Sequence, residues 1–248
     1  FDDDFYHEFK TAAKTKQVTT FSLLNSQTDF YAKNIEYLPQ GVSFTLVSPD
    51  SEFNLELAVY GEYNIYNILS VVASAAALGF SVAEIASKLS GLTPISGRLE
   101  KIENTGDVDV IVDFAHTADA LESVLAGIKC HAENNLWCVF GCGGDRDAGK
   151  RPLMAAAAER LADQIVVTSD NPRTENSDRI IQDITAGFSR IDAVTFISER
   201  VSAIEYAVMN ANAGDVILIA GKGHENYQII GTEKLPFSDV ACARLAVR

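Results

Sequence analysis

The first part of the chain alternates hydrophobic and polar residues in short runs. These runs are rich in β-branched and aromatic residues, and they predict four strands, at residues 18–23, 30–38, 43–47 and 53–60. Turn signals at 39–41 and 49–51 separate the last three of these runs, which suggests a small antiparallel meander. An Ala-rich stretch at 64–80 predicts a buried helix. Ser81 followed by Glu84 is typical of a capping box and predicts the start of another helix.

The pattern changes near Gly97, where uniformly apolar strands begin to alternate with helices. The predicted strands are 108–114, 136–140, 164–168, 193–197 and 216–220, and the predicted helices are 118–131, 152–162, 178–188 and 200–211. Apolar strands separated by helices favour a Rossmann-like, doubly wound and mostly parallel sheet. The predicted fold class is therefore α/β, with one domain at 1–96 and a second at 97–248.

The loops that follow four of these strands carry glycines, charged residues and histidines. They lie at residues 113–117, 141–147, 169–173 and 221–225. In an open parallel sheet, ligands bind beyond the carboxyl ends of the strands. We therefore expect the functional site to lie in these four loops.

The loop at 141–151 resembles two phosphate-binding motifs without completing either. Arg146 stands where a dinucleotide fingerprint has its third glycine, and Arg151 stands where a P-loop has Ser or Thr. Two alternatives remain: a glycine turn before a helix, or a ligand loop. In the second case Arg146 is the specific contact, because its planar fork suits a carboxylate.

Residues 170–173, Asp-Asn-Pro-Arg, combine acid, amide and guanidinium groups around a proline. They predict either a capped turn or a pocket for a zwitterion. In such a pocket Arg173 takes the carboxylate, and Asp170 or Asn171 takes the ammonium. The loop at 221–225 is either a flexible turn or a backbone approach to a ligand beside Glu225. We interpret His224 as a structural, hydrogen-bonded residue.

Two further groups are candidates for binding a nucleotide. Asp113 is placed to accept hydrogen bonds from ribose hydroxyls, whereas His116 and Thr117 are alternatively caps of the next helix.

Asn64 and Asn67 begin the Ala-rich helix as caps or as contacts to a base or phosphate. Arg98 forms an interdomain ion pair or a phosphate contact. Together the residues indicate a charged pocket for an amino acid with more than one carboxylate, and they leave the reaction open.

Composition excludes several classes of protein. A net charge of −14 argues against general nucleic-acid binding, which demands Lys and Arg. No apolar stretch reaches the roughly 18 residues of a membrane span, and the acidic N-terminus lacks a signal-peptide pattern. The four cysteines show no metal-ligand spacing. We expect reduced cysteines and a cytoplasmic, monomeric protein without membrane or nucleic-acid partners.

Four segments closely resemble the MurE ligases of the Mur ligase family, in order and in spacing. They are residues 96–100, 112–117, 136–147 and 220–228. The resemblance covers nearly the whole chain, and residues 1 to about 95 resemble the later part of the family's central domain. It implies an ATP- and Mg²⁺-dependent enzyme that adds meso-diaminopimelate to UDP-N-acetylmuramoyl-L-alanyl-D-glutamate. The resemblance also implies that ATP phosphorylates the γ-carboxylate, and that the amine of the amino acid then attacks the acyl phosphate and displaces phosphate.

The resemblance also implies residue roles. Residues 170–173 look like the family's signature for diaminopimelate, whose second carboxylate lysine lacks. The amino-acid site would be lined by Arg146, Asp170, Asn171, Pro172, Arg173, Gly221 and Glu225, with Glu225 pairing with the distal ammonium. The residues near ATP would be Asn64, Asn67, Arg98, Asp113 and His116. Phe114 and Ala118 depart from the Tyr and Pro that are usual in the family, and we expect effects on packing only.

The family's nucleotide loop, Gly-Thr-x-Gly-Lys-Thr, does not occur in this sequence. Its modified, Mg²⁺-supporting lysine and its N-terminal domain would lie upstream. We therefore expect a fragment without metal ligands or catalytic residues of its own, which does not turn over alone. The competing interpretations are a related amide ligase such as a folylpolyglutamate synthetase, a Rossmann-like oxidoreductase, and a non-catalytic amino-acid-binding module.

Overall fold

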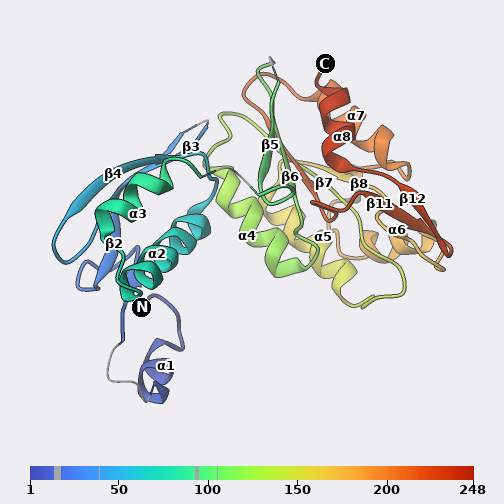
Figure 1. Cartoon of the computed structure of the whole chain (residues 1–248). Coiled ribbons are helices and arrows are strands. Elements are labelled where there is room, and N and C mark those ends of the chain that lie inside the picture. The colour runs from blue at the N-terminus through green and yellow to red at the C-terminus, as the bar shows by residue number, and fades with distance from the viewer. Residues whose placement is uncertain (14–17, 39, 93–94, 105) are drawn as a thin grey trace. The chain divides into compact units, whose positions relative to one another are not determined.

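The computed structural model describes residues 1–13, 18–38, 40–92, 95–104 and 106–248. The chain divides into two units, Phe1–Thr93 and Pro94–Arg248 (Figure 1). The division falls three residues before the boundary expected from the sequence.

The first unit contains a four-stranded sheet in the order β1-β2-β3-β4. Its strands are β1 (Phe21–Ser22), β2 (Phe30–Leu38), β3 (Gly41–Val47) and β4 (Glu52–Leu57). Strands β2, β3 and β4 pair antiparallel, as predicted.

The prediction for 18–23 was wrong in length, because β1 has only two residues, and it pairs parallel with β2. The Oγ of Ser22 accepts hydrogen bonds from the backbone N–H groups of Leu24 and Asn25, and Asp2 accepts one from Leu23. Side chains therefore bind the backbone donors that a longer strand would offer to its neighbour.

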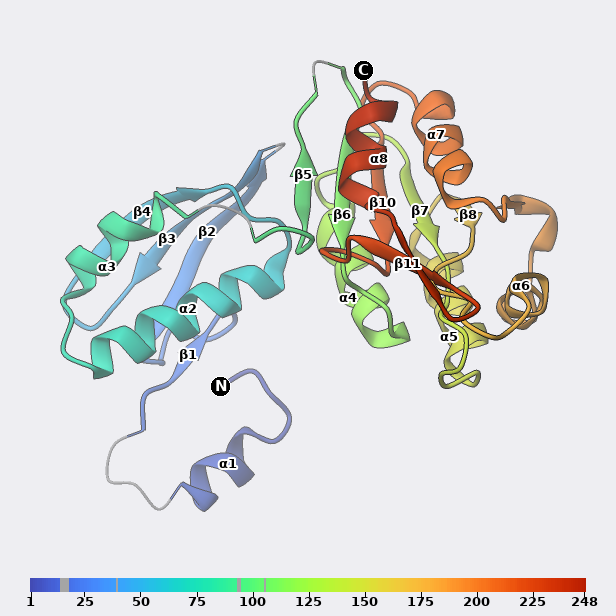
Figure 2. The ribbon, with the colours of Figure 1, turned by 45° about the vertical axis from the view of Figure 1, so that its right-hand side comes forward.

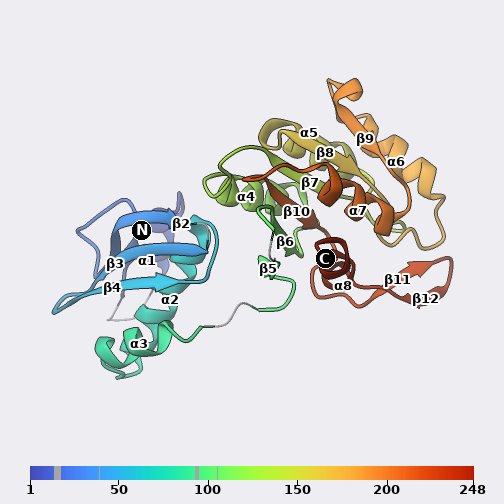
Figure 3. The ribbon, with the colours of Figure 1, turned by 90° about the horizontal axis from the view of Figure 1, so that it is seen from above.

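The first unit has three helices, α1 (Tyr6–Ala12), α2 (Glu62–Ala77) and α3 (Val82–Leu89). Figure 3 shows α2 and α3 against one face of the sheet. Ile65, Leu69 and Val72 of α2 are fully buried there and form part of the core. The predicted capping box is confirmed, since Ser81 accepts from the Glu84 N–H and Glu84 accepts from the Ser81 N–H.

The second unit contains a six-stranded sheet in the order β5-β6-β10-β7-β8-β9. Its strands are β5 (Glu100–Ile102), β6 (Asp109–Asp113), β7 (Leu136–Phe140), β8 (Gln164–Val167), β9 (Val194–Phe196) and β10 (Val216–Ala220). All neighbours pair parallel except β5, an antiparallel edge strand that the sequence pattern did not predict. The Rossmann-like, mostly parallel architecture is confirmed.

Helices cover both faces of this sheet, with α7 and α8 on one and α4 and α5 on the other (Figure 2). The helices are α4 (Ala118–Lys129), α5 (Lys150–Leu161), α6 (Ser177–Thr185), α7 (Arg200–Asn210) and α8 (Asp239–Ala246), with a short 3₁₀ turn at Ile191–Ala193. Strands β11 (Tyr227–Ile230) and β12 (Glu233–Pro236) form a separate antiparallel hairpin. Among the described residues, no helix is long and apolar enough to cross a membrane. All four cysteines are free in this structure.

Candidate functional site

The order of the strands gathers the candidate loops at one edge of the second sheet. Strand β10 lies between β6 and β7, and β8 pairs with β7 on the other side. Because these four strands are parallel, their carboxyl ends lie at the same edge. The loops after Asp113, Phe140, Val167 and Ala220 therefore meet there, as predicted.

A buried lysine connects the two loops that follow β8 and β10. The Nζ of Lys222 lies 2.8 Å from Asn171 Oδ1, 3.3 Å from Glu225 Oε2 and 3.8 Å from Asp170 Oδ1. The side-chain amide of Asn171 in turn donates to Glu225 Oε2 at 2.9 Å. We call Asp170, Asn171, Lys222 and Glu225 the Lys222 cluster. It brings together three of the residues predicted for the amino-acid site.

Arg173 is held by backbone contacts on both sides. Its N–H donates to the carbonyl of Ile229 at 3.0 Å, and its Nη1 donates to the carbonyl of Gly144 at 2.7 Å. Its φ of 53° lies in the left-handed region, which is uncommon for a residue with a side chain. The surrounding hydrogen bonds therefore fix a conformation that Arg173 would not adopt by preference.

Two glycines allow the loops after β7 and β8 to touch. A Cβ at Gly144 would lie 1.9 Å from the carbonyl oxygen of Pro172, and one at Gly143 would lie 2.9 Å from Arg173 Nη1 and 3.9 Å from Arg146 Cγ. Gly143 is thus flanked by the two arginines that were predicted to take carboxylates. Arg146 is exposed, and no other described residue forms a hydrogen bond or ion pair with its guanidinium.

Gly221 begins the loop after β10 with a φ of 116°. A Cβ there would lie 2.8 Å from Asp170 Oδ2, so only glycine permits this approach between the two loops. Its N–H donates to the carbonyl of Asp113 at 3.1 Å. The predicted residue therefore packs directly against the Lys222 cluster.

Two of the predicted nucleotide residues lie at the carboxyl end of β6: Asp113 ends the strand and His116 is in the loop that follows, whereas Arg98 precedes β5. Asp113 is buried, and its two oxygens accept hydrogen bonds from the N–H groups of Leu99 (2.8 Å) and Ala115 (2.7 Å). Burial raises the pKa of Asp113, against the lowering effect of these bonds and of Arg98. Both oxygens already bind backbone, so Asp113 joins the junction near residue 99 to the end of β6.

The Phe114 ring contacts one arginine and two histidines near Asp113. The Arg98 guanidinium lies 4.7 Å from the centre of the Phe114 ring, and the rings of His116 and His224 lie 4.6 and 5.0 Å from it. His224 is exposed and packs against Phe114. Thr117 caps α4 by accepting from the Ala120 N–H at 3.3 Å, which confirms one of the two alternatives for the segment 116–117.

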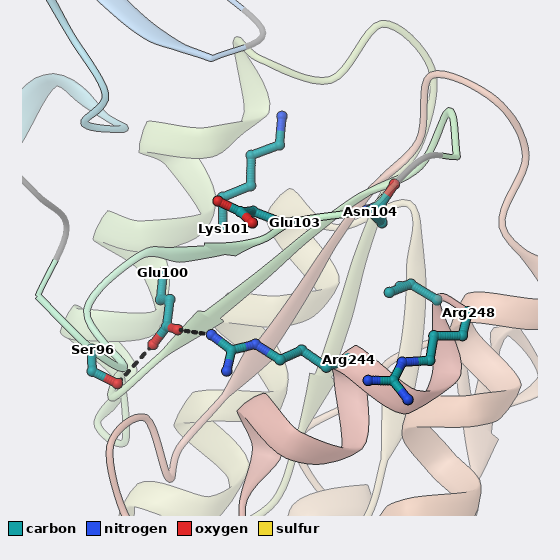
Figure 4. Close-up of a pocket in the computed structure, with 8 residues that line it drawn as sticks. Ser96, Glu100, Lys101, Glu103, Asn104, Arg244 and Arg248 are labelled. Atoms are coloured by element: carbon teal, nitrogen blue, oxygen red, sulfur yellow. Dashed lines mark hydrogen bonds and ion pairs between the residues drawn. The ribbon is translucent and has the colours of Figure 1, made fainter.

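The junction before β5 packs against the loop after β10. A Cβ at Gly97 would lie 2.0 Å from the backbone nitrogen of His224. Glu100 holds this junction by accepting hydrogen bonds from Ser96 Oγ and the Gly97 N–H, both at 2.8 Å, and from Arg244 at 3.2 Å (Figure 4). Ser96, Glu100 and Arg244 also line a charged pocket of 660 Å³ between β5 and α8. None of the predicted site residues lines it.

Asn64 and Asn67 lie in the first unit, where Asn67 donates to Asn64 Oδ1 at 3.1 Å. The suggestion that Asn64 caps α2 was wrong, because Gly61 occupies the N-cap with a φ of 80°. The amide of Asn64 instead donates to the carbonyl of Tyr60 at 2.8 Å. Their contact to a nucleotide stays a prediction.

Sequence reasoning missed three buried cations. Besides Lys222, they are Arg151, which bonds to Asp183, Glu175 and the carbonyl of Gly143, and Arg200, which bonds to Asp239. Arg151 was noted only as a departure from a P-loop. Through the carbonyl of Gly143, Arg151 contacts the loop after β7. A local sequence pattern does not indicate that such a residue is buried.

Within the described segments, no three His, Cys, Asp or Glu side chains form a group that would hold a metal ion.

Comparison with known proteins agrees with the division of the chain into two units. Residues 97–223 match the family described as Mur ligase, glutamate ligase domain, and residues 1–75 match the Mur ligase middle domain. UDP-N-acetylmuramoyl-L-alanyl-D-glutamate–2,6-diaminopimelate ligases are similar: 44% identity over 99% of this chain for Pseudomonas aeruginosa and 44% over 98% for Geobacillus thermodenitrificans. The chain spans about half the length of these relatives, 50% and 49%.

Solved structures show the same relationship. A structure of a ligase with the same name superimposes on the whole chain with a TM-score of 0.73 and 38% identity, over 52% of its own length. A folylpolyglutamate synthase from Mycobacterium tuberculosis, at 20% identity and a TM-score of 0.60, shares the fold alone. The match of the family's glutamate ligase domain to more than half of the residues, together with these relatives, shows that this chain belongs to the Mur ligase family.

Proposed function

We propose that this chain forms the amino-acid-binding part of a ligase that adds meso-diaminopimelate to UDP-N-acetylmuramoyl-L-alanyl-D-glutamate. The observation that carries the proposal is the Lys222 cluster together with two arginines, Arg146 and Arg173, that both lie near Gly143. Diaminopimelate has an ammonium and a carboxylate at each end. A site with carboxylates and separate guanidinium groups complements that pattern of charge.

The free atoms of these residues suggest their roles. Glu225 uses Oε2 for Asn171 and Lys222, and its Oε1 takes no hydrogen bond from the described residues. That oxygen is available to the distal ammonium. Arg173 uses Nη1 for the carbonyl of Gly144, which leaves further N–H donors for the distal carboxylate. Arg146 is exposed and also lies near Gly143, so we propose that its guanidinium binds the other carboxylate of the ligand.

ATP and Mg²⁺ are part of the proposal, with most of their ligands outside this chain. Arg98 and His116, around the Phe114 ring, supply cationic and hydrogen-bonding groups for phosphate, and Asn64 and Asn67 are proposed contacts from the first unit. The described residues offer no acidic cluster for Mg²⁺, which when bound would stabilise charge during phosphoryl transfer. We propose that the chain acts as a cytoplasmic monomer and binds the amino acid, but does not turn over alone.

Binding of the amino acid tests the proposal directly. We would titrate the chain with meso-diaminopimelate and separately with L-lysine, and follow backbone amide shifts by NMR. Saturable shifts at residues 170–173 and 221–225 with diaminopimelate alone are the expected result. The Arg173→Ala variant should abolish them, because the second carboxylate loses its guanidinium.

The matched control is Arg190→Ala, because Arg190 lies before β9, at the amino end of the sheet, and is 70% exposed. It should bind like the unmodified chain. Equal responses to both amino acids would contradict a site built for two carboxylates. Release of phosphate that required both diaminopimelate and the UDP-linked substrate would contradict the expectation that the chain does not turn over.

A further inference from the structure

Lys222 is a fully buried cation whose partners all belong to the proposed amino-acid site. Its side chain is 0% exposed, and the rings of Tyr227 and Phe237 lie 5.9 and 5.8 Å from its Nζ. A charge in such surroundings is stable only when it is paired and hydrogen-bonded. Asp170 and Glu225 supply that pairing, so the site holds one cation between two carboxylates.

The position of Lys222 determines which way the amide of Asn171 points. Asn171 Oδ1 accepts two hydrogen bonds, from Lys222 Nζ at 2.8 Å and from the Ile229 N–H at 3.0 Å. With its oxygen held between two donors, the amide must direct its NH₂ group the other way. That group donates to Glu225 Oε2 at 2.9 Å.

Glu225 is therefore held through a single oxygen. Lys222 and Asn171 both contact Oε2, and no described residue donates to Oε1. The formal charges of the cluster, two carboxylates against one ammonium, leave one negative charge for a ligand. One additional ammonium would neutralise it.

We propose that Lys222 is the positioning residue that makes this site selective for a second ammonium group on the ligand. Lys222 orients Asn171 and leaves one oxygen of Glu225 available to the ligand. The cluster then carries one net negative charge, which one ammonium group of the ligand neutralises. The choice of diaminopimelate as the ligand rests on the proposed function. The orientation of Asn171 and Glu225 does not rest on it.

The first test needs no ligand. We would compare the side-chain NH₂ resonances of Asn171 in the unmodified chain and in Lys222→Met, which keeps the length of the side chain and removes its charge. In Lys222→Met, we expect the Asn171 NH₂ protons to lose the chemical shift that is typical of a hydrogen bond to a carboxylate. We also expect these protons to exchange faster with water. The control is Lys234→Met, since Lys234 contacts the Tyr227 ring at 3.5 Å but not Asn171. Unchanged Asn171 resonances in a folded Lys222→Met variant would overturn the proposal.

The second test varies the ligand. Binding of meso-diaminopimelate and of L-2-aminopimelate, which has both carboxylates but lacks the distal amino group, would be measured by calorimetry. Lys222→Met should weaken the binding of diaminopimelate by about 10- to 100-fold, because the distal ammonium loses its charged hydrogen bond to an oriented Glu225. The binding of aminopimelate, which lacks that ammonium, should change little. Equal weakening of both ligands would overturn the selectivity role. Failure of the unmodified chain to bind either ligand would contradict the proposed function, while the Asn171 resonances would still decide the positioning role.

Lys222→Met leaves the buried carboxylate of Asp170 and the half-buried one of Glu225 without their cation, which can prevent this variant from folding. In that event Glu225→Gln is compared with the double variant Lys222→Met, Glu225→Gln, in which both charges are absent. Glu225→Gln should keep the amide of Asn171 ordered, because Lys222 still holds Oδ1. The double variant should release it. If the Asn171 side-chain resonances were identical in Glu225→Gln and in the double variant, the proposal would be overturned.

Discussion

The guanidinium of Arg200 and the carboxylate of Asp239 form an ion pair in which both side chains are 0% exposed. Two hydrogen bonds of 2.7 and 2.8 Å join them, and Arg200 also donates to the carbonyls of Ser169 and Ala220. Those carbonyls belong to the exits of β8 and β10. The pair therefore fixes the bases of the two loops that form the Lys222 cluster.

Replacing one partner of this pair should destabilise the chain strongly. Arg200→Met leaves Asp239 as an uncompensated buried charge, and we expect the free energy of unfolding to fall by about 3–5 kcal/mol. Urea denaturation followed by circular dichroism measures this. Arg160→Met is the control, because Arg160 and Glu122 form an exposed pair worth less than about 1 kcal/mol. Equal effects of the two variants would contradict the structural role of Arg200.

The contribution of Asp215 to stability should depend on pH. Its carboxylate accepts four hydrogen bonds of 2.9 to 3.1 Å, from the N–H groups of Asn135 and Asn212 and from the side chains of Asn135 and Trp137. Burial raises the pKa of Asp215, but these bonds outweigh it and hold that pKa below its ordinary value of 3.8.

Because the unfolded chain binds this proton more readily, the stabilisation by Asp215 is complete above pH 3.8 and is lost as the pH falls through the folded pKa. The difference in unfolding free energy between the unmodified chain and Asp215→Asn should therefore shrink as the pH is lowered from about 6 to about 3. Urea titrations at a series of pH values measure it. If the difference in unfolding free energy stayed constant over this range, or grew as the pH fell, the pKa of Asp215 would not be lowered in the folded chain.

Gly144→Ala should disrupt contact between the loops after β7 and β8. The new Cβ would meet the Pro172 carbonyl oxygen at 1.9 Å, and a backbone atom cannot move away as a flexible side chain does. We expect a loss of at least about 1–3 kcal/mol, the usual cost of overpacking, and shifted amide signals at residues 170–173. Gly106→Ala is the control, since its Cβ would meet only Asn104 Oδ1 at 3.6 Å. Equal stability of the two variants would contradict the close contact between Gly144 and the Pro172 carbonyl.

Removing the cap of α4 should have a smaller effect. Thr117→Ala deletes the oxygen that accepts from the Ala120 N–H, and we expect a loss of about 1 kcal/mol in unfolding free energy. Thr117→Ser retains the hydroxyl and should lie within a few tenths of a kcal/mol of the unmodified chain. Thermal and urea denaturation measure both. A Ser variant as unstable as the Ala variant would show that the methyl group, rather than the cap, matters.

The strands of the parallel sheet could be predicted because their sequences are uniformly apolar. The bounds of β7 and β10 were predicted correctly, and every residue of both strands is buried. Strands without that signal were missed. Strand β5 has three residues at an edge, and β12 is fully exposed and ends in Pro236. The pairing of such strands depends on their neighbours in the fold, and the alternation of hydrophobic and polar residues within the strand itself does not indicate it.

The candidate loops could be predicted from their composition and position, but the contacts within them could not. A lysine between two glycines, as in residues 221–223, has no local feature that indicates burial. Only the fold places Asn171 and Glu225 around Lys222, through strands that are far apart in the chain. Arg200 was likewise included in the predicted helix 200–211, with nothing in the local sequence to indicate that it is buried.

The place of β10 in the sheet has a consequence for the order in which the chain folds during synthesis. This strand joins β6 to β7, yet its residues, Val216–Ala220, are translated after all the other strands of that sheet. Until they leave the ribosome, β6 has no parallel neighbour and β7 has an open edge. Domains tend to fold as units, and unpaired strand edges promote aggregation. A nascent chain that stops before residue 216 would expose both edges, so we expect its misassembly and proteolysis to decrease once residues 216–220 have been synthesised and can pair with β6 and β7.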